Sequence, residues 1–123
     1  MKRPQLERIA AQVVETTQRE LPPRVREVAA RVAVHFEPSP AADVLAEGLE
    51  PDLLGLFTGD PLGSEDQAGQ GAPPQIHLYT ANLWDYAGGD PGAFREEVRL
   101  TYLHELGHFL GWDEDQVAAR GLD

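Results

Sequence analysis

Two histidines and a glutamate near the end of the chain have the types and spacing of a metal site. They lie in the stretch His104-Glu105-Leu-Gly-His108. On an α-helix, residues four apart lie one turn apart on the same face, so the two imidazoles can bind one metal ion from the same side. Zinc held in this way lowers the pKa of a coordinated water from about 15.7 to about 7, which makes a hydroxide nucleophile available at neutral pH. The carboxylate of Glu105, on the neighbouring flank of the helix, can accept the proton of that water.

The residues after His108 offer a third ligand. Gly111 is where the helix can end, because glycine enters the left-handed conformation without a Cβ penalty. After this turn, Glu114 completes the pattern H-E-x-x-H-x-x-G-x-x-E, with an aspartate on either side. Residues 113–116 also form a capping-box pattern, in which Asp113 caps a short final helix and leaves Glu114 as the preferred ligand. Asp113 is the alternative third ligand, and Asp115 is a weaker one.

Together with two upstream stretches, these residues resemble the bacterial zincin-like metallopeptidases that are described as minimal zincins. The likeness rests on residues 101–115 and extends upstream through residues 53–62 and 75–79. The resemblance implies a compact zincin domain that binds one zinc ion and hydrolyses peptide bonds. It assigns roles to four positions of this chain: the metal ligands His104, His108 and Glu114, and the catalytic base Glu105.

The chain departs from a second group of zincins, the metzincins. Metzincins share the spacing of the motif but use a third histidine and a turn that contains methionine. Here the third position is Glu114, and the only methionine is Met1. A metzincin is therefore not the expected type.

The length of the chain predicts a single domain that spans residues 1–123, and the resemblance to the minimal zincins implies an α+β fold for it. Apolar residues at three- and four-residue spacing predict two long helices, over residues 5–20 and from residue 91 through the motif. Alternating or β-branched stretches predict three strands, over residues 31–37, 52–58 and 75–80. Shorter helical stretches are predicted over residues 24–31, 41–48 and 82–86. We expect a small mixed β-sheet packed on the N-terminal helix and the motif helix, the compact minimal zincin fold.

The motif helix is predicted to have a core face and a separate metal face. Asp90 has the residue type of an N-cap, and Pro91 suits the first helical position. On a helical wheel one side carries Val98, Tyr102, Leu106, Phe109 and Leu110, and another carries Glu97, Thr101, His104 and His108. This separation argues that the two histidines are not buried packing residues.

Zincins bind an extended substrate along an edge strand near the metal helix. Residues 75–80 are our candidate for that edge strand, because they come nearest in sequence before the motif helix, and residues 52–58 are apolar enough to lie centrally. A peptidase also needs a second group to stabilise the oxyanion besides the metal. Only nine residues follow Glu114, and none is Tyr or His, so the donor is expected upstream. The available donors are His77, Tyr79, Tyr86 and Tyr102, and of these His77 and Tyr79 are the candidates.

The composition limits the kinds of partner and the compartment that we expect. The chain has 21 acidic and 10 basic residues and a formal charge of −11, which disfavours binding to nucleic acid. It contains no cysteine, so disulfides and thiolate zinc sites are excluded. No apolar run approaches the length of a membrane span, and the N-terminus lacks an apolar signal-peptide core. We therefore expect a soluble cytoplasmic protein, with no preference for an oligomeric state.

These observations favour a zinc-dependent metallopeptidase that acts on peptides or unfolded proteins. The alternative is a zinc-stabilised binding or regulatory domain without catalysis. A structural zinc site normally closes with four protein ligands, whereas a catalytic site keeps one position for water. Three candidate ligands plus Glu105 favour the catalytic interpretation.

Overall fold

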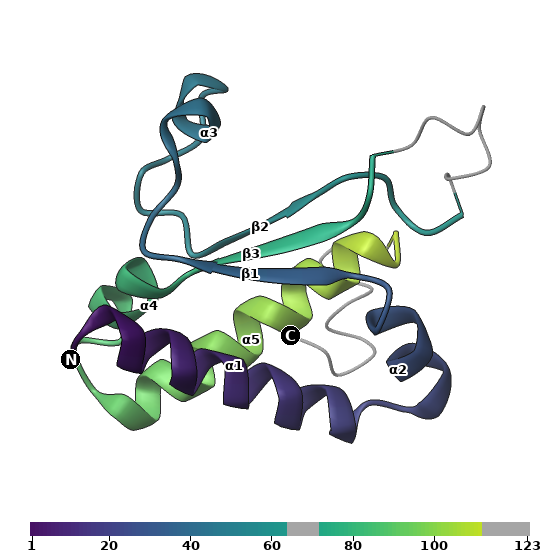
Figure 1. Cartoon of the computed structure of the whole chain (residues 1–123), viewed down its shortest axis with the longest axis horizontal. Helices are drawn as coiled ribbons and strands as arrows, with labels where there is room; N and C mark the ends of the chain where they lie inside the picture. The colour runs from purple at the N-terminus through teal and green to yellow at the C-terminus, as the bar shows by residue number, and fades with distance from the viewer. Residues whose placement is uncertain (64–71, 112–123) are drawn as a thin grey trace.

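A computed structural model describes residues 1–63 and 72–111 of the chain (Figure 1). Within these residues the chain forms five helices and three strands. In chain order they are α1 (Arg3–Glu20), α2 (Pro23–Ala29), β1 (Ala33–Glu37), α3 (Ala42–Ala46), β2 (Gly55–Thr58), β3 (Gln75–Tyr79), α4 (Thr80–Tyr86) and α5 (Pro91–Phe109). The predicted order of helices and strands is confirmed, with boundaries that shift by up to three residues.

The two long helices form as the apolar spacing predicts. Leu6, Ala10, Val14 and Thr17 recur along one side of α1 and are buried. The helix ends at Glu20, and the prolines at positions 22 and 23 prevent its continuation. Helix α5 contacts α1 directly, and the buried sides of both helices share one core.

The three strands form a mixed sheet in the order β1-β3-β2. Strand β1 runs parallel to β3, and β2 runs antiparallel to it. The prediction that residues 75–80 form an edge strand is therefore wrong, as is the central position expected for residues 52–58. β3 is the middle strand because it pairs with both β1 and β2, and its alternating Ile76 and Leu78 are fully buried in the core. The apolar Leu53 and Leu54 precede β2, so they do not make it a central strand.

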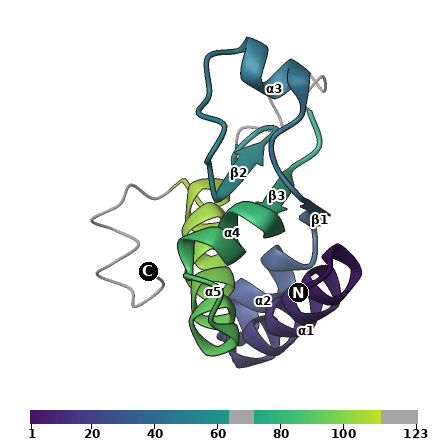
Figure 2. The same ribbon diagram turned by 90° about the vertical axis from the view of Figure 1, so that its left-hand side faces the viewer.

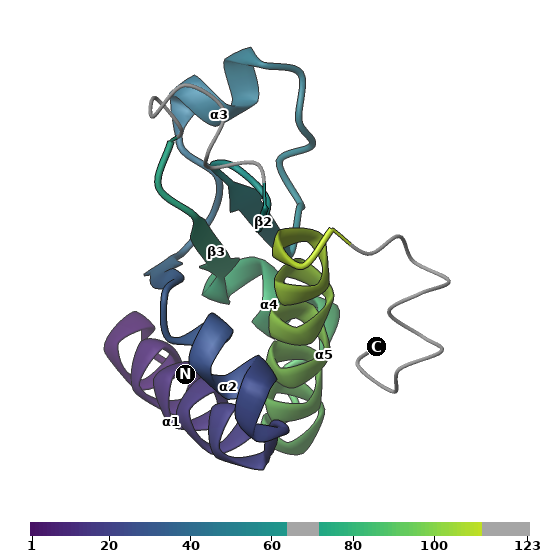
Figure 3. The same ribbon diagram turned by 90° about the vertical axis from the view of Figure 1, so that its right-hand side faces the viewer.

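Within the described residues, long helices cover one face of the sheet and not the other (Figures 1, 2 and 3). Helix α1 lies under β1, and α5 lies under β2 and β3. Strand residues that point to this side include Phe36, Phe57, Ile76 and Leu78, which all belong to the core or pack against it. The α+β class and the packing of a mixed sheet on the N-terminal and motif helices are thus confirmed. Among the described residues, no helix is long and apolar enough to span a membrane.

Candidate metal centre

Helix α5 presents the motif in a well-defined segment. It begins at Pro91, and the side chain of the N-cap Asp90 accepts a hydrogen bond of 2.7 Å from the backbone N–H of Ala93. It ends at Phe109, and Gly111 has φ of +77°, the left-handed conformation expected at the end of this helix. Both predicted ends are confirmed. The motif therefore occupies the last two turns of the helix.

The predicted separation of faces on α5 is present. Phe94, Val98, Tyr102, Leu106 and Phe109 are almost completely buried in the core. His104 is half-buried, and His108 is exposed. Because the core residues lie on other sides of the helix, the histidines remain accessible to a metal ion from solvent.

The geometry of the two histidines would allow both to bind one ion. Their Nε2 atoms lie 3.1 Å apart, and their rings meet at an interplanar angle of 85°. Two nitrogens bound at about 2.0–2.1 Å to one tetrahedral zinc lie about 3.3 Å apart. A carboxylate oxygen of Glu105 joins the two histidine nitrogens in a group whose atoms all lie within 4.8 Å of one another. This donor set fits a zinc ion.

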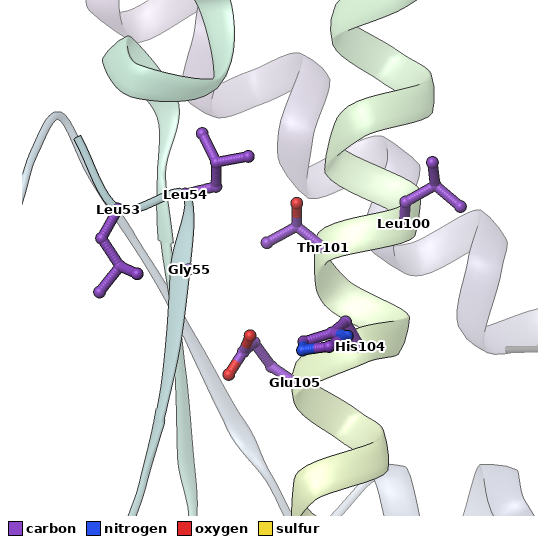
Figure 4. A pocket seen from close by; sticks show the side chains of 7 residues that line it. All are labelled: Leu53, Leu54, Gly55, Leu100, Thr101, His104 and Glu105. Carbon is purple, nitrogen blue, oxygen red and sulfur yellow. The ribbon is translucent and has the colours of Figure 1, made fainter. Parts of the chain in front are cut away.

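Glu105 is a buried carboxyl group beside this pair. Its side chain points from α5 toward β2 (Figure 4), and the residue is 9% exposed. Burial raises the pKa of Glu105, because the charged form loses solvation. The nearby His108 and a hydrogen bond from the Phe57 backbone oppose this shift. Glu105 therefore holds a proton more readily than an ordinary glutamate, which suits a group that accepts and returns protons.

An open cleft of about 400 Å³ lies against Glu105 and His104, between α5 and the start of β2 (Figure 4). Its other lining residues are Leu53, Leu54, Gly55, Leu100 and Thr101. Thr101 was predicted to lie on the metal face of the motif helix, but no site role was predicted for any of these five residues. The available signal was Gly55, since a glycine inside an apolar strand pattern marks a bulge or a close approach by another part of the molecule.

Comparison with known proteins agrees with this geometry. The model of the family described as zincin-like metallopeptidase matches residues 29–122. The chain belongs to this family. No curated protein matches it. The match covers every strand of the sheet and the whole of α5, so the family assignment includes both sides of the cleft. For a zincin-like metallopeptidase, the motif His104-Glu105-x-x-His108 on α5 is the expected zinc site.

The candidates for the third ligand lie in the C-terminal residues that the structure does not describe. Glu114 and its alternative Asp113 lie outside the described residues, which end at Gly111. Glu114 therefore stays a prediction from the sequence.

His77 lies on the opposite face of the sheet from α5. Its Nδ1 is 2.6 Å from a carboxylate oxygen of Glu37, and its Nε2 is 3.4 Å from the hydroxyl of Thr58. Its ring also stacks on that of His35, with centroids 5.1 Å apart. The structure does not bring His77 to the histidine pair on α5. Its side chain stabilises the outer face of the sheet.

We expect replacement of His77 to leave the proposed zinc site intact. A His77→Gln variant should keep the zinc content of the wild type and a kcat within about twofold of it, because surface substitutions away from a site have small effects. Zinc analysis and a peptidase assay check this. A tenfold loss of kcat with zinc retained would restore an oxyanion role to His77.

Tyr79 is a buried residue at the end of β3. It is 1% exposed and does not line the cleft beside Glu105. Burial raises its pKa to about 12, with smaller contributions from the charges of Glu37, Asp43 and Glu105. As the last residue of β3, it donates its backbone N–H to the carbonyl of Leu54 at 3.0 Å. Tyr79 therefore contributes to the sheet and its surroundings, and the structure does not place it as an oxyanion donor.

Burial of Tyr79 predicts a loss of stability at high pH. The unfolded chain loses the tyrosine proton near pH 10, whereas the folded chain keeps it until about pH 12. The contribution is complete below pH 10 and is lost as the pH rises through that window. Between pH 9 and pH 12 the unfolding free energy of the wild type should fall by roughly 1–2 kcal/mol more than that of Tyr79→Phe. Urea unfolding at several pH values measures this, and parallel curves would contradict it.

Proposed function

We propose that this chain hydrolyses peptide bonds in a zinc-dependent reaction, with one zinc ion bound by His104 and His108 and with Glu105 as the catalytic base. One observation carries the proposal. The Nε2 atoms of the two histidines face each other at 3.1 Å, the Glu105 carboxylate lies close to both, and Glu105 and His104 line an open cleft. Glu114 is the proposed third ligand, with Asp113 as its alternative.

A zinc ion at this position would polarise the scissile carbonyl and make a water molecule nucleophilic at neutral pH. The chain's own residues do the rest. Glu105 takes a proton from the attacking water and passes it to the leaving amine. Neither His77 nor Tyr79 takes part in this reaction as we propose it.

The proposed substrate is a peptide or an unfolded protein segment in extended form. Strand β2 is an edge of the sheet and borders the cleft, so the backbone of Gly55 on its free side can pair with such a segment. This role replaces the one expected for residues 75–80. The cleft beside Glu105 and His104 has three leucines in its lining, which favours an apolar side chain next to the scissile bond.

Hydrolysis of unfolded casein by the zinc-loaded protein tests the proposal. We expect new peptide fragments, which should disappear when a chelator removes the metal and return when zinc is added back. If the protein binds one zinc ion per chain but never cleaves casein or a mixed peptide library, the peptidase assignment fails. The zinc-stabilised binding domain would then be the better interpretation.

A further inference from the structure

Strand β2 and helix α5 contact each other at regular intervals, once before Glu105 and once after it along the helix. Thr101, Glu105 and Phe109 are spaced by four residues and therefore lie along one face of α5. Four residues of helix rise about 6 Å, and two residues of strand rise about 6.8 Å. Gly55 therefore lies beside the helical turn that contains Thr101. Phe57 lies beside the next two turns, which contain Glu105 and Phe109.

At the first of these contacts only a glycine fits. A Cβ atom at Gly55 would lie 2.6 Å from the Cγ2 methyl of Thr101 and 3.5 Å from Cγ of Glu105. It would also lie 3.2 Å from the carbonyl oxygen of His77. The φ of Gly55 is not positive, so any residue could adopt its backbone conformation. Glycine is required there only because a side chain would clash with its neighbours. The missing side chain lets β2 approach the helix one turn before Glu105.

At the second contact the strand offers a backbone donor to the carboxylate. The carbonyl of Leu54 accepts the N–H of Tyr79, so Leu54 and Tyr79 form a hydrogen-bonded pair of the antiparallel ladder. Such pairs alternate along the strand, which turns the N–H of Phe57 to the free edge. The Phe57 backbone N–H acts on the Glu105 carboxyl and lowers its pKa, and the Glu105 side chain points toward β2 from α5 (Figure 4).

The end of β2 is also attached to α5. The rings of Phe57 and Phe109 lie 5.8 Å apart between centroids. The backbone N–H of Leu62 donates to the carbonyl of Phe109 at 2.7 Å. Glu105 thus lies between a close approach at Gly55 and an aromatic contact at Phe57, and a displacement of β2 at either point moves the donor away from the carboxylate.

We propose that Gly55 and Thr101 are positioning residues for Glu105, because their close contact sets the separation of β2 and α5 at which the Phe57 N–H orients the carboxylate. The inference rests on the proposed function for its effect on catalysis. The contact itself is independent of that function. Gly55, Thr101 and Phe57 all lie outside the H-E-x-x-H motif.

The amide of Phe57 reports this contact directly. In the zinc-loaded wild type, this edge amide should exchange its hydrogen slowly, as measured by nuclear magnetic resonance. Glu105→Ala removes the acceptor and should speed exchange at Phe57 by about tenfold or more. Gly55→Ala should do the same, because the new methyl clashes with that of Thr101. The double variant Gly55→Ala/Thr101→Ser lacks the clashing methyl and should return to within about threefold of the wild type.

A second amide separates this effect from general loosening of the fold. Leu56 pairs with His77 inside the ladder, so its amide should stay protected in all four proteins. Equal exchange at Phe57 in the wild type, Glu105→Ala and Gly55→Ala would overturn the inference. So would a failure of Thr101→Ser to restore protection in a folded double variant.

Kinetics with a peptide cleaved by the wild type test the consequence for catalysis. Gly55→Ala should lower kcat at least tenfold with KM changed less than twofold, and the double variant should recover most of kcat. A loss seen in KM alone would overturn the positioning role. If the wild type shows the predicted exchange pattern but cleaves nothing, the proposed function fails and the contact between β2 and Glu105 stands.

Discussion

Replacing Glu105 by glutamine is expected to lower kcat by about 10²–10⁴-fold, the range that a positioned general base contributes. Glutamine has nearly the same shape and can still accept a hydrogen bond from the Phe57 backbone, but it cannot take a proton from water. Zinc content should stay at the wild-type level, because both histidines are unchanged. The melting temperature should stay equal or rise, since a neutral amide avoids the desolvation cost that raises the pKa of Glu105.

The matched control is Glu96→Gln, the same substitution on the exposed side of the same helix. Glu96 pairs with Arg99 at 2.7 Å, and exposed pairs of this kind contribute little to stability. Peptide cleavage by three zinc-loaded proteins should therefore separate Glu105→Gln from the wild type and Glu96→Gln. Undiminished cleavage by Glu105→Gln would mean that another group is the base.

Replacing His104 by alanine is expected to abolish zinc-dependent stabilisation. A ligand that binds only the folded chain stabilises it by about 4 kcal/mol when its free concentration is 1,000 times its Kd. For a domain of this size that corresponds to an increase of roughly 10 °C or more in melting temperature. Zinc should raise the melting temperature of the wild type by an amount in this range and leave that of His104→Ala nearly unchanged.

His35→Ala is the control for this experiment. His35 is an exposed histidine on the sheet face away from α5, where it stacks on His77. Its loss removes one imidazole without touching the pair on α5, so the response to zinc should equal that of the wild type. A full zinc response in His104→Ala would place the metal elsewhere on the chain.

The motif and its helix could be predicted from the sequence because their determinants are local. The N-cap Asp90, the four-residue spacing of the histidines and the terminal Gly111 each act within a few residues. The core face of α5 follows from the same periodicity, and its buried residues include Val98 and Tyr102 as expected. The resemblance of residues 101–115 to a known family then supplied the α+β fold.

The surroundings of Glu105 could not be predicted, because they depend on strand order. Alternation along residues 75–79 and 55–58 identifies strands but carries no information about which strand is central. The sheet places β3 in the middle, which removes His77 from the metal side and brings the edge of β2 to the cleft. The contact between Gly55 and Thr101 joins residues far apart in sequence, so no local sequence pattern predicts it.

The zinc content of the purified protein tests the central claim most directly. We predict one zinc ion per chain in the wild type and in Glu105→Gln, and none in His104→Ala or His108→Ala, measured by elemental analysis after dialysis against dilute zinc. That result would place the ion on the two histidines of α5. Absence of zinc from the wild type after zinc is added back, or its retention by both histidine variants, would contradict the account.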